Sequence, residues 1–354
     1  MRGRKAEFER KLAQTGLWQL PDLLQALPDE TARLAWLCYA ASPAGDWLDT
    51  PPEVFFSCAA HARFLRENAA WMRALPEPLF LAYVLHPRVN NEALCDCRPV
   101  FYAALAERLR GLPEEAAILE INRWCAEHVA YQPTDERTRS ALAVLRAGFG
   151  RCGEESMFAV NVLRACGFAA RQVYVPRWAH CDDNHAWVEV RCGGAWHFLG
   201  ACEPEAVLDR GWFNSAAGRA VLVHSRCFGE PEPGADLIGR EGDVVYCNET
   251  ARYADVRRLT VRVTDENGMS AAGADVDFCI LNNCEWYPAA TVQTDASGMA
   301  ALTCGLGSLR LLARRGGLCC EAFVSPEETG PVVLTLGKRA PAPDRWEPIE
   351  LTAP

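Results

Sequence analysis

The stretch that decides the fold is "FGRCGEESMFAVNVLRACGF", residues 149–168. A glycine-rich loop runs there into a pattern of helical spacing, with Phe158 and Val162 on one face and Gly167 as the expected stop. Cys152 therefore stands in the first turn of a predicted helix. Unpaired backbone N–H groups and the helix dipole stabilise a thiolate at that position, so this cysteine is a candidate nucleophile.

Some immediate neighbours of Cys152 favour a reactive thiolate, and others disfavour it. Glycines on both sides leave room for a substrate carbonyl, and Arg151 adds positive potential. Glu154 and Glu155 follow in the first helical turn and raise the pKa of the thiol if they face it. The alternative to a nucleophile is a small buried side chain, which is what most of the 17 cysteines are expected to be.

A histidine partner is available in "DDNHAWVEV", residues 182–190. The strand-like alternation puts His185 on the same face as Trp187 and Glu189, and Glu189 is expected to pair with an arginine such as Arg171. A cysteine, a helix, strands and then a histidine at a strand start form an arrangement that can hold a thiolate–imidazolium ion pair.

Charge and hydropathy exclude several classes of protein. The 354-residue chain carries a net charge of −10, whereas nucleic-acid binders usually present a basic face. No apolar run reaches the roughly 18 residues that a membrane helix needs, and acidic residues interrupt the basic beginning, so no signal peptide is expected. We therefore predict a cytoplasmic protein with no nucleic-acid or membrane partner.

The cysteine pattern does not indicate a metal site. The cysteines are scattered through helical and strand-like segments, which is typical of proteins in a reducing compartment. The pairs Cys95/Cys97 and Cys319/Cys320 lack the two-residue gap of zinc knuckles, so we predict no metal and no cofactor.

The spacing of apolar residues along the chain predicts an α+β fold. Helical spacing dominates the first part, a helix and three strands with a Gly-Gly hairpin follow, and short β-rich runs fill the last part. A stretch with Pro231, Pro233 and several acids is expected to connect the core to the β-rich part. The predicted segments are a helical N-terminal region (1–115), a core (116–228), a linker (229–256), a β-sandwich (257–337) and a proline-rich tail (338–354).

Several ordered motifs of the core resemble those of the transglutaminase-like superfamily. They are the Gly-x-Cys-Gly helix start (Gly150–Gly153), "GFAARQV" (167–173), the His-x-Trp-x-Glu strand (His185–Glu189) and a Trp-led strand that ends in an acid-proline pair (Trp196–Pro204). The resemblance implies a papain-like thiol enzyme, with Cys152 as nucleophile and His185 as general base.

The third catalytic member departs from the family pattern. An Asp is expected about 15 residues after the histidine, and position 200 is a glycine. Glu203, before a proline, fits that element displaced by a short insertion, and its carboxylate would orient the imidazole. Asp182 and Asp183 are the alternatives.

Further site residues follow from the same resemblance and from position beside the histidine. The residues predicted to contact substrate are Arg177, Trp178, Asn184 and Trp187, although Trp187 has packing within the sheet as its alternative. The predicted oxyanion donors are the backbone N–H of Cys152 and the side chain of Gln132.

The last part of the chain resembles the carboxypeptidase-regulatory or transthyretin-like sandwich, an Ig-like fold seen in many bacterial multidomain proteins. Its motifs are Asp-x-x-Gly, Gly-Ala-x-Val and Thr-Asp-x-x-Gly before an apolar strand. The resemblance implies a spacer or docking module.

Three functions remain open at this point. The first is a Cys-His-carboxylate enzyme that cleaves an amide of a peptide or protein substrate through an acyl-enzyme, with hydrolysis favoured over crosslinking because nothing marks a groove for a lysine acceptor. The second is a catalytically inactive scaffolding protein with the same fold, which Gly200 supports. The third is a thiol redox or metal protein, supported by the cysteine count alone. The sequence does not indicate an oligomeric state.

Overall fold

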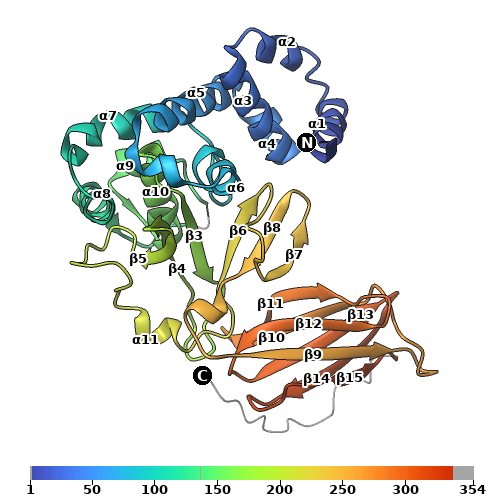
Figure 1. Ribbon diagram of the computed structural model, residues 1–354. Coiled ribbons are helices and arrows are strands. Elements are labelled where there is room, and N and C mark those ends of the chain that lie inside the picture. The colour runs from blue at the N-terminus through green and yellow to red at the C-terminus, as the bar shows by residue number, and fades with distance from the viewer. Residues whose placement is uncertain (1, 136, 338–354) are drawn as a thin grey trace.

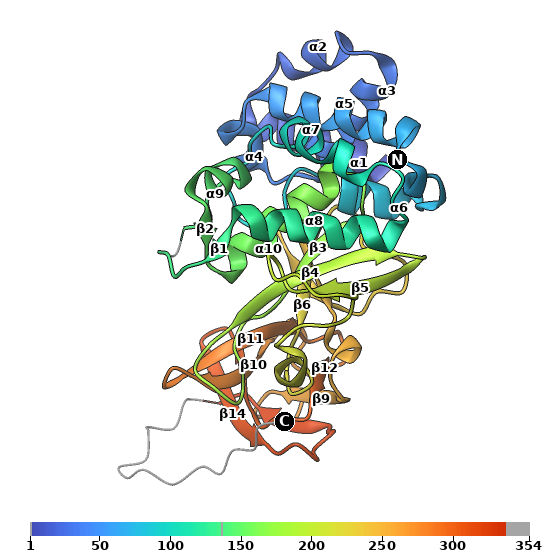
Figure 2. The same cartoon turned by 90° about the vertical axis from the view of Figure 1, so that its left-hand side faces the viewer.

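The chain folds into three stacked parts: a helical N-terminal region, a central sheet with its own helices, and two further sheets at the C-terminal end (Figures 1 and 2). The computed structural model describes residues 2–135 and 137–337, so the predicted tail, 338–354, lies outside the described residues. The predicted α+β class is confirmed.

Helices make up the first part of the chain: those from α1 to η2 pack around one apolar core, and α7, α8 and α9 pack around a second that they share with α10 (Cys152–Ala165) and the central sheet. They are α1 (Arg2–Thr15), α2 (Leu20–Gln25), α3 (Asp29–Ala41), α4 (Ala44–Asp49), α5 (Pro52–Asn68), η1 (Ala70–Ala74), α6 (Glu77–Phe80), η2 (Leu81–Leu85), α7 (Arg98–Leu109), α8 (Glu114–His128) and α9 (Ala141–Ala147). No helix among the described residues is long and apolar enough to cross a membrane.

The central sheet has six strands in the order β5-β4-β3-β6-β8-β7, and all neighbouring strands are antiparallel. Its strands are β3 (Ala170–Val175), β4 (His185–Cys192), β5 (Ala195–Leu199), β6 (His224–Phe228), β7 (Leu237–Glu241) and β8 (Val244–Asn248). The smaller elements around it are β1 (Ala130–Tyr131), β2 (Phe149–Gly150), α11 (Asn214–Ala217) and η3 (Thr250–Arg252). The predicted Gly-Gly hairpin joins β4 to β5, and both glycines have positive φ.

The helix that begins with the candidate nucleophile is α10 (Cys152–Ala165), which packs against β3 and β4. From Glu154 onward every side chain of α10 is buried, and Gly167, with φ of 89°, follows its end as predicted. The burial explains why the sequence of this helix is apolar on more than one face.

The linker predicted over 229–256 is wrong in its middle part. Residues 237–248 form the β7–β8 hairpin, which pairs through β8 with β6 and completes the central sheet. Pro231 and Pro233 lie before this hairpin, and Gly242, with φ of 56°, supplies its turn. The strands are short, and their pairing depends on β6, so composition alone did not identify them.

A buried carboxylate joins the strands of the central sheet to the segment that follows it. Glu189 on β4 is fully buried and accepts hydrogen bonds from Arg171 on β3 (Nη2, 2.6 Å), Arg252 (Nε, 2.7 Å) and Tyr253 (Oη, 2.6 Å). The predicted pairing of Glu189 with Arg171 is confirmed. Since Arg252 and Tyr253 belong to the predicted linker, this network also shows that the core extends past residue 228.

The C-terminal sheets, residues 256–337, enclose an apolar core of their own. One sheet has the order β11-β10-β13-β14 and the other β12-β9-β15, an arrangement compatible with the predicted sandwich. The strands are β9 (Val256–Thr264), β10 (Asp275–Asn282), β11 (Glu285–Gln293), β12 (Met299–Gly305), β13 (Leu309–Arg315), β14 (Leu318–Val324) and β15 (Val332–Thr335).

The C-terminal sheets are held tightly against the rest of the chain. The N–H of Gly305 donates to the carbonyl of Val221 over 2.9 Å, and Asn248 Nδ2 donates to the carbonyl of Thr303 over 2.7 Å. A Cβ at position 305 would lie 2.0 Å from the carbonyl oxygen of Ala220, so only glycine fits this contact.

We expect Glu189→Gln to lower the free energy of unfolding by about 3 kcal/mol, because it removes the negative charge from a buried ionic network and leaves Arg252 without a carboxylate partner, while Arg171 keeps only Glu249. The matched control is Glu321→Gln, which breaks an exposed pair with Arg310 and costs less than about 1 kcal/mol. Urea unfolding of both variants beside the wild type measures the difference, and equal losses would contradict the importance assigned to Glu189.

Candidate active site

Cys152 and His185 line the same pocket, of about 280 Å³, between the start of α10 and strands β3 and β4. Arg177 and Asn184, two of the residues predicted to contact substrate, line it as well. The structure therefore brings together the predicted nucleophile, the predicted base and half of the predicted substrate contacts.

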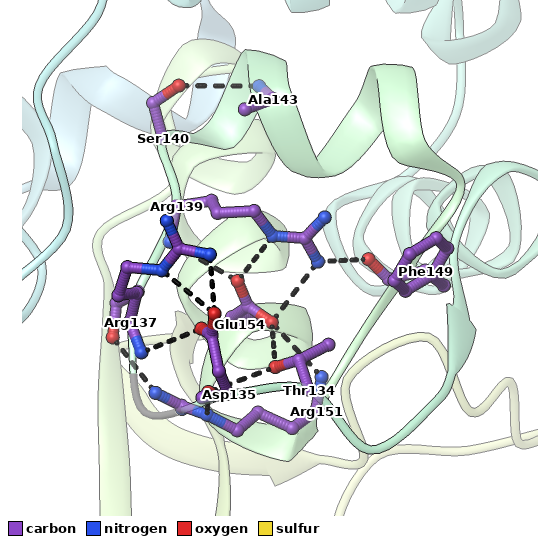
Figure 3. A network of polar contacts seen from close by, with 10 residues as sticks. Thr134, Asp135, Arg137, Arg139, Ser140, Ala143, Phe149, Arg151 and Glu154 are labelled. Atoms are coloured by element: carbon purple, nitrogen blue, oxygen red, sulfur yellow. Dashed lines mark hydrogen bonds and ion pairs between the residues drawn. The ribbon is translucent and has the colours of Figure 1, made fainter.

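The start of α10 is fixed by Glu154, whose carboxylate lies in a polar network with Thr134, Arg139 and Arg151 (Figure 3). Its fully buried carboxylate accepts hydrogen bonds from Arg139 Nε (2.8 Å), Thr134 Oγ1 (2.9 Å) and the backbone N–H of Arg151 (3.3 Å). Burial alone would raise the pKa of Glu154, but the hydrogen bonds from Arg139 and Thr134 outweigh it and hold the pKa below its usual value. A Cβ at Gly150 would lie 2.9 Å from the Cβ of Glu154, so the glycine is required by this packing.

The thiol of Cys152 is protonated at neutral pH. Burial raises its pKa, hydrogen bonds from the backbone of Ala186 and Gly153 and the charge of Arg151 lower it, and Glu155 raises it again, with a net upward shift. Of the two glutamates, Glu155 is thus the one that acts on the sulfur.

The imidazole of His185 is neutral at the same pH. Only 8% of this residue is exposed, and burial lowers its pKa to about 4 against a smaller opposing effect of Asp183. Its ring lies between aromatic rings, with centroid distances of 4.8 Å to Trp212 and 5.1 Å to Phe213.

The ion pair expected from the sequence is not formed in this structure. Within residues 2–135 and 137–337, no hydrogen bond joins the sulfur of Cys152 to the ring of His185, and His185 Nε2 is buried without a partner. The physical reason is desolvation, which disfavours both charged forms. The site holds a neutral thiol beside a neutral imidazole, and an imidazole in that state is a base.

Glu203 fills the space in which the family pattern expects an aspartate side chain. A Cβ built on Gly200 would lie 2.3 Å from Glu203 Oε2 and 3.0 Å from Glu203 Cβ. This carboxylate accepts a hydrogen bond from Trp212 Nε1 (2.9 Å) through Oε1, while Oε2 is buried and has no partner among the described residues. Because Trp212 also packs on His185, the carboxylate is connected to the histidine through an indole ring rather than by a direct hydrogen bond.

The alternative carboxylates are engaged elsewhere. Asp182 accepts the backbone N–H of Asn283 (2.7 Å), and Asp183 accepts that of Asn184 (2.7 Å). Asp183 acts on His185 through its charge, which raises the histidine pKa, and no hydrogen bond joins these two side chains in the described part of the chain.

Three other predicted residues do not line the pocket. Trp187 is fully buried and donates to the hydroxyl of Tyr253 over 3.0 Å, and Trp178 belongs to the same apolar core. The side chain of Gln132 is exposed, and its backbone N–H donates to the carbonyl of Gly150 over 2.9 Å. The backbone N–H of Cys152, the other predicted oxyanion donor, belongs to the first residue of α10, where helical N–H groups have no partner within the helix.

Sequence reasoning missed the polar side chains that stabilise the site from behind. Gln172 on β3 donates to the carbonyl of Gly153 (2.9 Å) and to Ser156 Oγ (2.7 Å), which ties α10 to the sheet. Glu155 is 4% exposed, and burial together with the charge of Glu203 raises its pKa to about 8. The polar pair Arg171–Gln172 within a strand that is otherwise alanine, valine and tyrosine was the one available signal.

A side chain from the C-terminal sheets holds the loop that leads into His185. Asn282, which is 1% exposed, donates from Nδ2 to the carbonyls of Trp178 (2.9 Å) and Cys181 (2.7 Å). The loop 176–184 is therefore fixed by a residue about a hundred positions later in the chain.

Comparison with known families agrees with this geometry. Residues 103–201 match the transglutaminase-like superfamily. These residues form a transglutaminase-like domain. It begins within α7, before the predicted boundary at 116, and it includes Cys152 and His185 but ends before Glu203. The match supports a thiol enzyme at the level of the superfamily.

Among the solved structures similar to the chain are two from different organisms, and no curated protein matches it. One is a candidate cysteine protease from Cytophaga hutchinsonii, with 16% identity, a TM-score of 0.30 and coverage of 50% of this chain and 65% of the other. The second is red sea bream transglutaminase, with 11% identity, a TM-score of 0.30 and coverage of 69% and 58%. The chain thus spans less than two thirds of the length of either protein.

We expect Asn282→Ala to free the loop 176–184, because it removes buried hydrogen bonds. Amide hydrogen exchange in this loop becomes about tenfold faster or more, while exchange in β10 and β13 stays as in the wild type. Asn267→Ala, an exposed asparagine of the C-terminal sheets, is the matched control. Unchanged exchange in the loop would show that Asn282 does not hold it.

The raised pKa of Glu155 predicts a pH dependence of stability. Between the unfolded value of 4.5 and the folded value of about 8, the folded protein keeps a proton that the unfolded chain releases. Stability from this group is present in full below pH 4.5 and is lost as the pH rises through 8. Glu155→Gln removes the effect, so urea unfolding should show the variant gaining on the wild type between pH 5 and pH 8; parallel curves would refute it.

Proposed function

We propose that the chain is a cysteine hydrolase that cleaves an amide of a peptide or protein substrate through a Cys152 acyl-enzyme. The observation that carries the proposal is the single pocket lined by Cys152 and His185 within a transglutaminase-like domain. No metal or cofactor takes part in it. In this scheme Arg177 and Asn184 contact the substrate, and the N–H of Cys152 donates to the oxyanion.

The neutral pair supports a general-base route. As the sulfur of Cys152 attacks the carbonyl carbon, His185 takes the thiol proton, and the charges that form are those of the oxyanion and the imidazolium. The C–N bond then breaks, and the amine leaves with the proton from His185. Water attacks the thioester, gives its proton to His185 and releases the acid, which restores the thiol.

Hydrolysis is favoured over crosslinking by the charge of the pocket. Arg151 and Arg177 line it, and no Asp or Glu is among its described lining residues. Crosslinking would need a lysine amine as the acceptor, and two guanidinium groups repel its ammonium form.

The carboxylate of Glu203 is proposed to act on His185 through Trp212. The indole N–H donates to Glu203, and the indole ring packs on the imidazole. In this role Glu203 positions the ring that carries the proton. Catalytic hydrogen bonds are often long or absent without substrate, so the unpartnered Glu203 Oε2 and His185 Nε2 are free to find partners in the complex.

An inactive scaffolding protein is the second candidate. Two observations favour it: the raised pKa of Cys152, and the lack of a hydrogen bond between the described side chains of His185 and any carboxylate. It differs from the first candidate in what it does to a substrate, so one experiment separates them.

The test incubates a peptide library with the wild type and with Cys152→Ser, and reads masses. Cleavage, deamidation and crosslinking give different mass changes. We expect cleavage by the wild type, and a loss of at least about a thousandfold in Cys152→Ser and in His185→Ala. Cys320→Ser, a thiol of the C-terminal sheets, keeps the activity. A library left intact by the wild type, or cleaved equally by Cys152→Ser, would favour the scaffold.

A further inference from the structure

A second cavity, of about 680 Å³, lies where the central sheet meets the C-terminal sheets. Strands β3, β6, β7 and β8 line one side of it and β10 and β11 the other. Tyr174, Pro176 and Tyr287 line both this cavity and the pocket of Cys152. The two are therefore parts of one junction groove, which runs from the candidate nucleophile across the boundary between the sheets.

Arg177 and Arg226, which line the junction groove, have no carboxylate partner among the described residues. Arg177 lies with its guanidinium 4.3 Å from the ring centroid of Tyr287, and its Nε is buried and unpartnered. Arg226 lies 5.4 Å and 5.7 Å from the rings of Tyr174 and Tyr246, and its Nε is likewise unpartnered.

The acidic side chains of the groove already have partners. Glu241 accepts from the hydroxyl of Tyr246 over 3.1 Å, and Asp275 accepts from Gln293 Nε2 over 3.0 Å. Neither is within ion-pair distance of Arg177 or Arg226 in the part of the chain that the structure describes, so these two guanidinium groups have no carboxylate partner within the groove.

A buried histidine next to Arg226 presents a further unpartnered polar atom to the groove. His224 is 5% exposed, and its Nδ1 has no hydrogen-bond partner in the described chain. Its ring packs on Tyr174 at 4.0 Å. Burial lowers its pKa to about 3, so it offers a neutral hydrogen-bonding nitrogen.

The position of Arg226 relative to Cys152 is fixed by a chain of hydrogen bonds. Arg226 donates to the side chain of Asn90, whose Nδ2 donates to Gln172 Oε1 over 2.5 Å. Gln172 Nε2 then donates to the carbonyl of Gly153 over 2.9 Å. The unpaired charge is thereby tied to the first turn of α10 through buried or half-buried side chains.

We propose that the junction groove binds a carboxylate of the substrate close to the amide presented to Cys152, with Arg177 and Arg226 as its partners. Arginine forks match carboxylate geometry, and tyrosine rings on both sides hold the guanidinium planes in place. The substrate class is an acidic peptide, in which the carboxylate belongs to a side chain or to the C-terminus. This inference rests on the proposed role of Cys152 as the reactive thiol.

The first arm of the test compares alkylation of Cys152 by iodoacetate, which carries a carboxylate, and by neutral iodoacetamide. Rates are read residue by residue by peptide mass spectrometry, because Cys95 is a competing thiol whose pKa is lowered to about 6 by a hydrogen bond from Cys97. The ratio of the two rates at exposed Cys284 is the internal reference.

We expect the iodoacetate-to-iodoacetamide ratio at Cys152 to exceed that at Cys284, and to fall about threefold in Arg177→Gln and in Arg226→Gln. Arg177→Lys keeps the charge and retains most of the preference. Arg262→Gln, an exposed arginine on β9, is the matched control and leaves the ratio unchanged. Equal ratios in the wild type and both glutamine variants would overturn the proposal.

The second arm separates the two sources of the carboxylate. Acetyl-Ala-Glu-Ala-amide, acetyl-Ala-Gln-Ala-amide and acetyl-Ala-Gln-Ala with a free C-terminus are compared as protectants of Cys152 against iodoacetamide. Stronger protection by the first peptide indicates a side-chain carboxylate, and by the third a terminal one. Equal protection by all three would count against the groove as a carboxylate site. A Cys152 that reacts with neither reagent would instead refute the proposed function itself.

Discussion

The buried carboxylate of Glu154 is the constraint on which the site depends. It accepts hydrogen bonds from the segment before the nucleophile and from the backbone N–H of Arg151, so it determines where α10 begins. With that start fixed, Cys152 is the first helical residue and its sulfur meets the backbone of β4. Glu155, which follows Glu154 in the first turn of the helix, is consequently directed toward Glu203 and the thiol.

Desolvation, rather than charge pairing, sets the protonation of the candidate groups. The thiol and the imidazole are both kept neutral, and Glu155 beside Glu203 keeps its proton past neutral pH. The candidate nucleophile and the candidate base therefore carry no charge before substrate arrives. The charges of the oxyanion and of the His185 imidazolium form only during the reaction. Backbone N–H groups and the orientation of the imidazole ring must stabilise them at that stage.

Local signals predicted the parts of the fold that local physics determines. The helix after Cys152, its stop at Gly167 and the Gly-Gly hairpin follow from spacing and positive φ. The contact of Asn282 could not be predicted in this way, because it joins segments about a hundred positions apart, and the β7–β8 hairpin was missed because its strands are short and complete a sheet begun by other segments. The expected thiolate–imidazolium pair is not formed for a related reason. Sequence spacing identified Cys152 and His185, but the burial that keeps both side chains neutral arises only from tertiary packing.

The hydrogen bonds of Asn282 have a consequence for how such chains diversify. A β-rich module at the end of a protein is usually exchangeable, since the surface by which it contacts its neighbour has no role in the active site. Here the tip of a hairpin in the last module supports the approach to His185. A homologue that acquires a different ending must therefore brace residues 176–184 by other means, so the length of that loop and the identity of the terminal module are expected to change together in evolution.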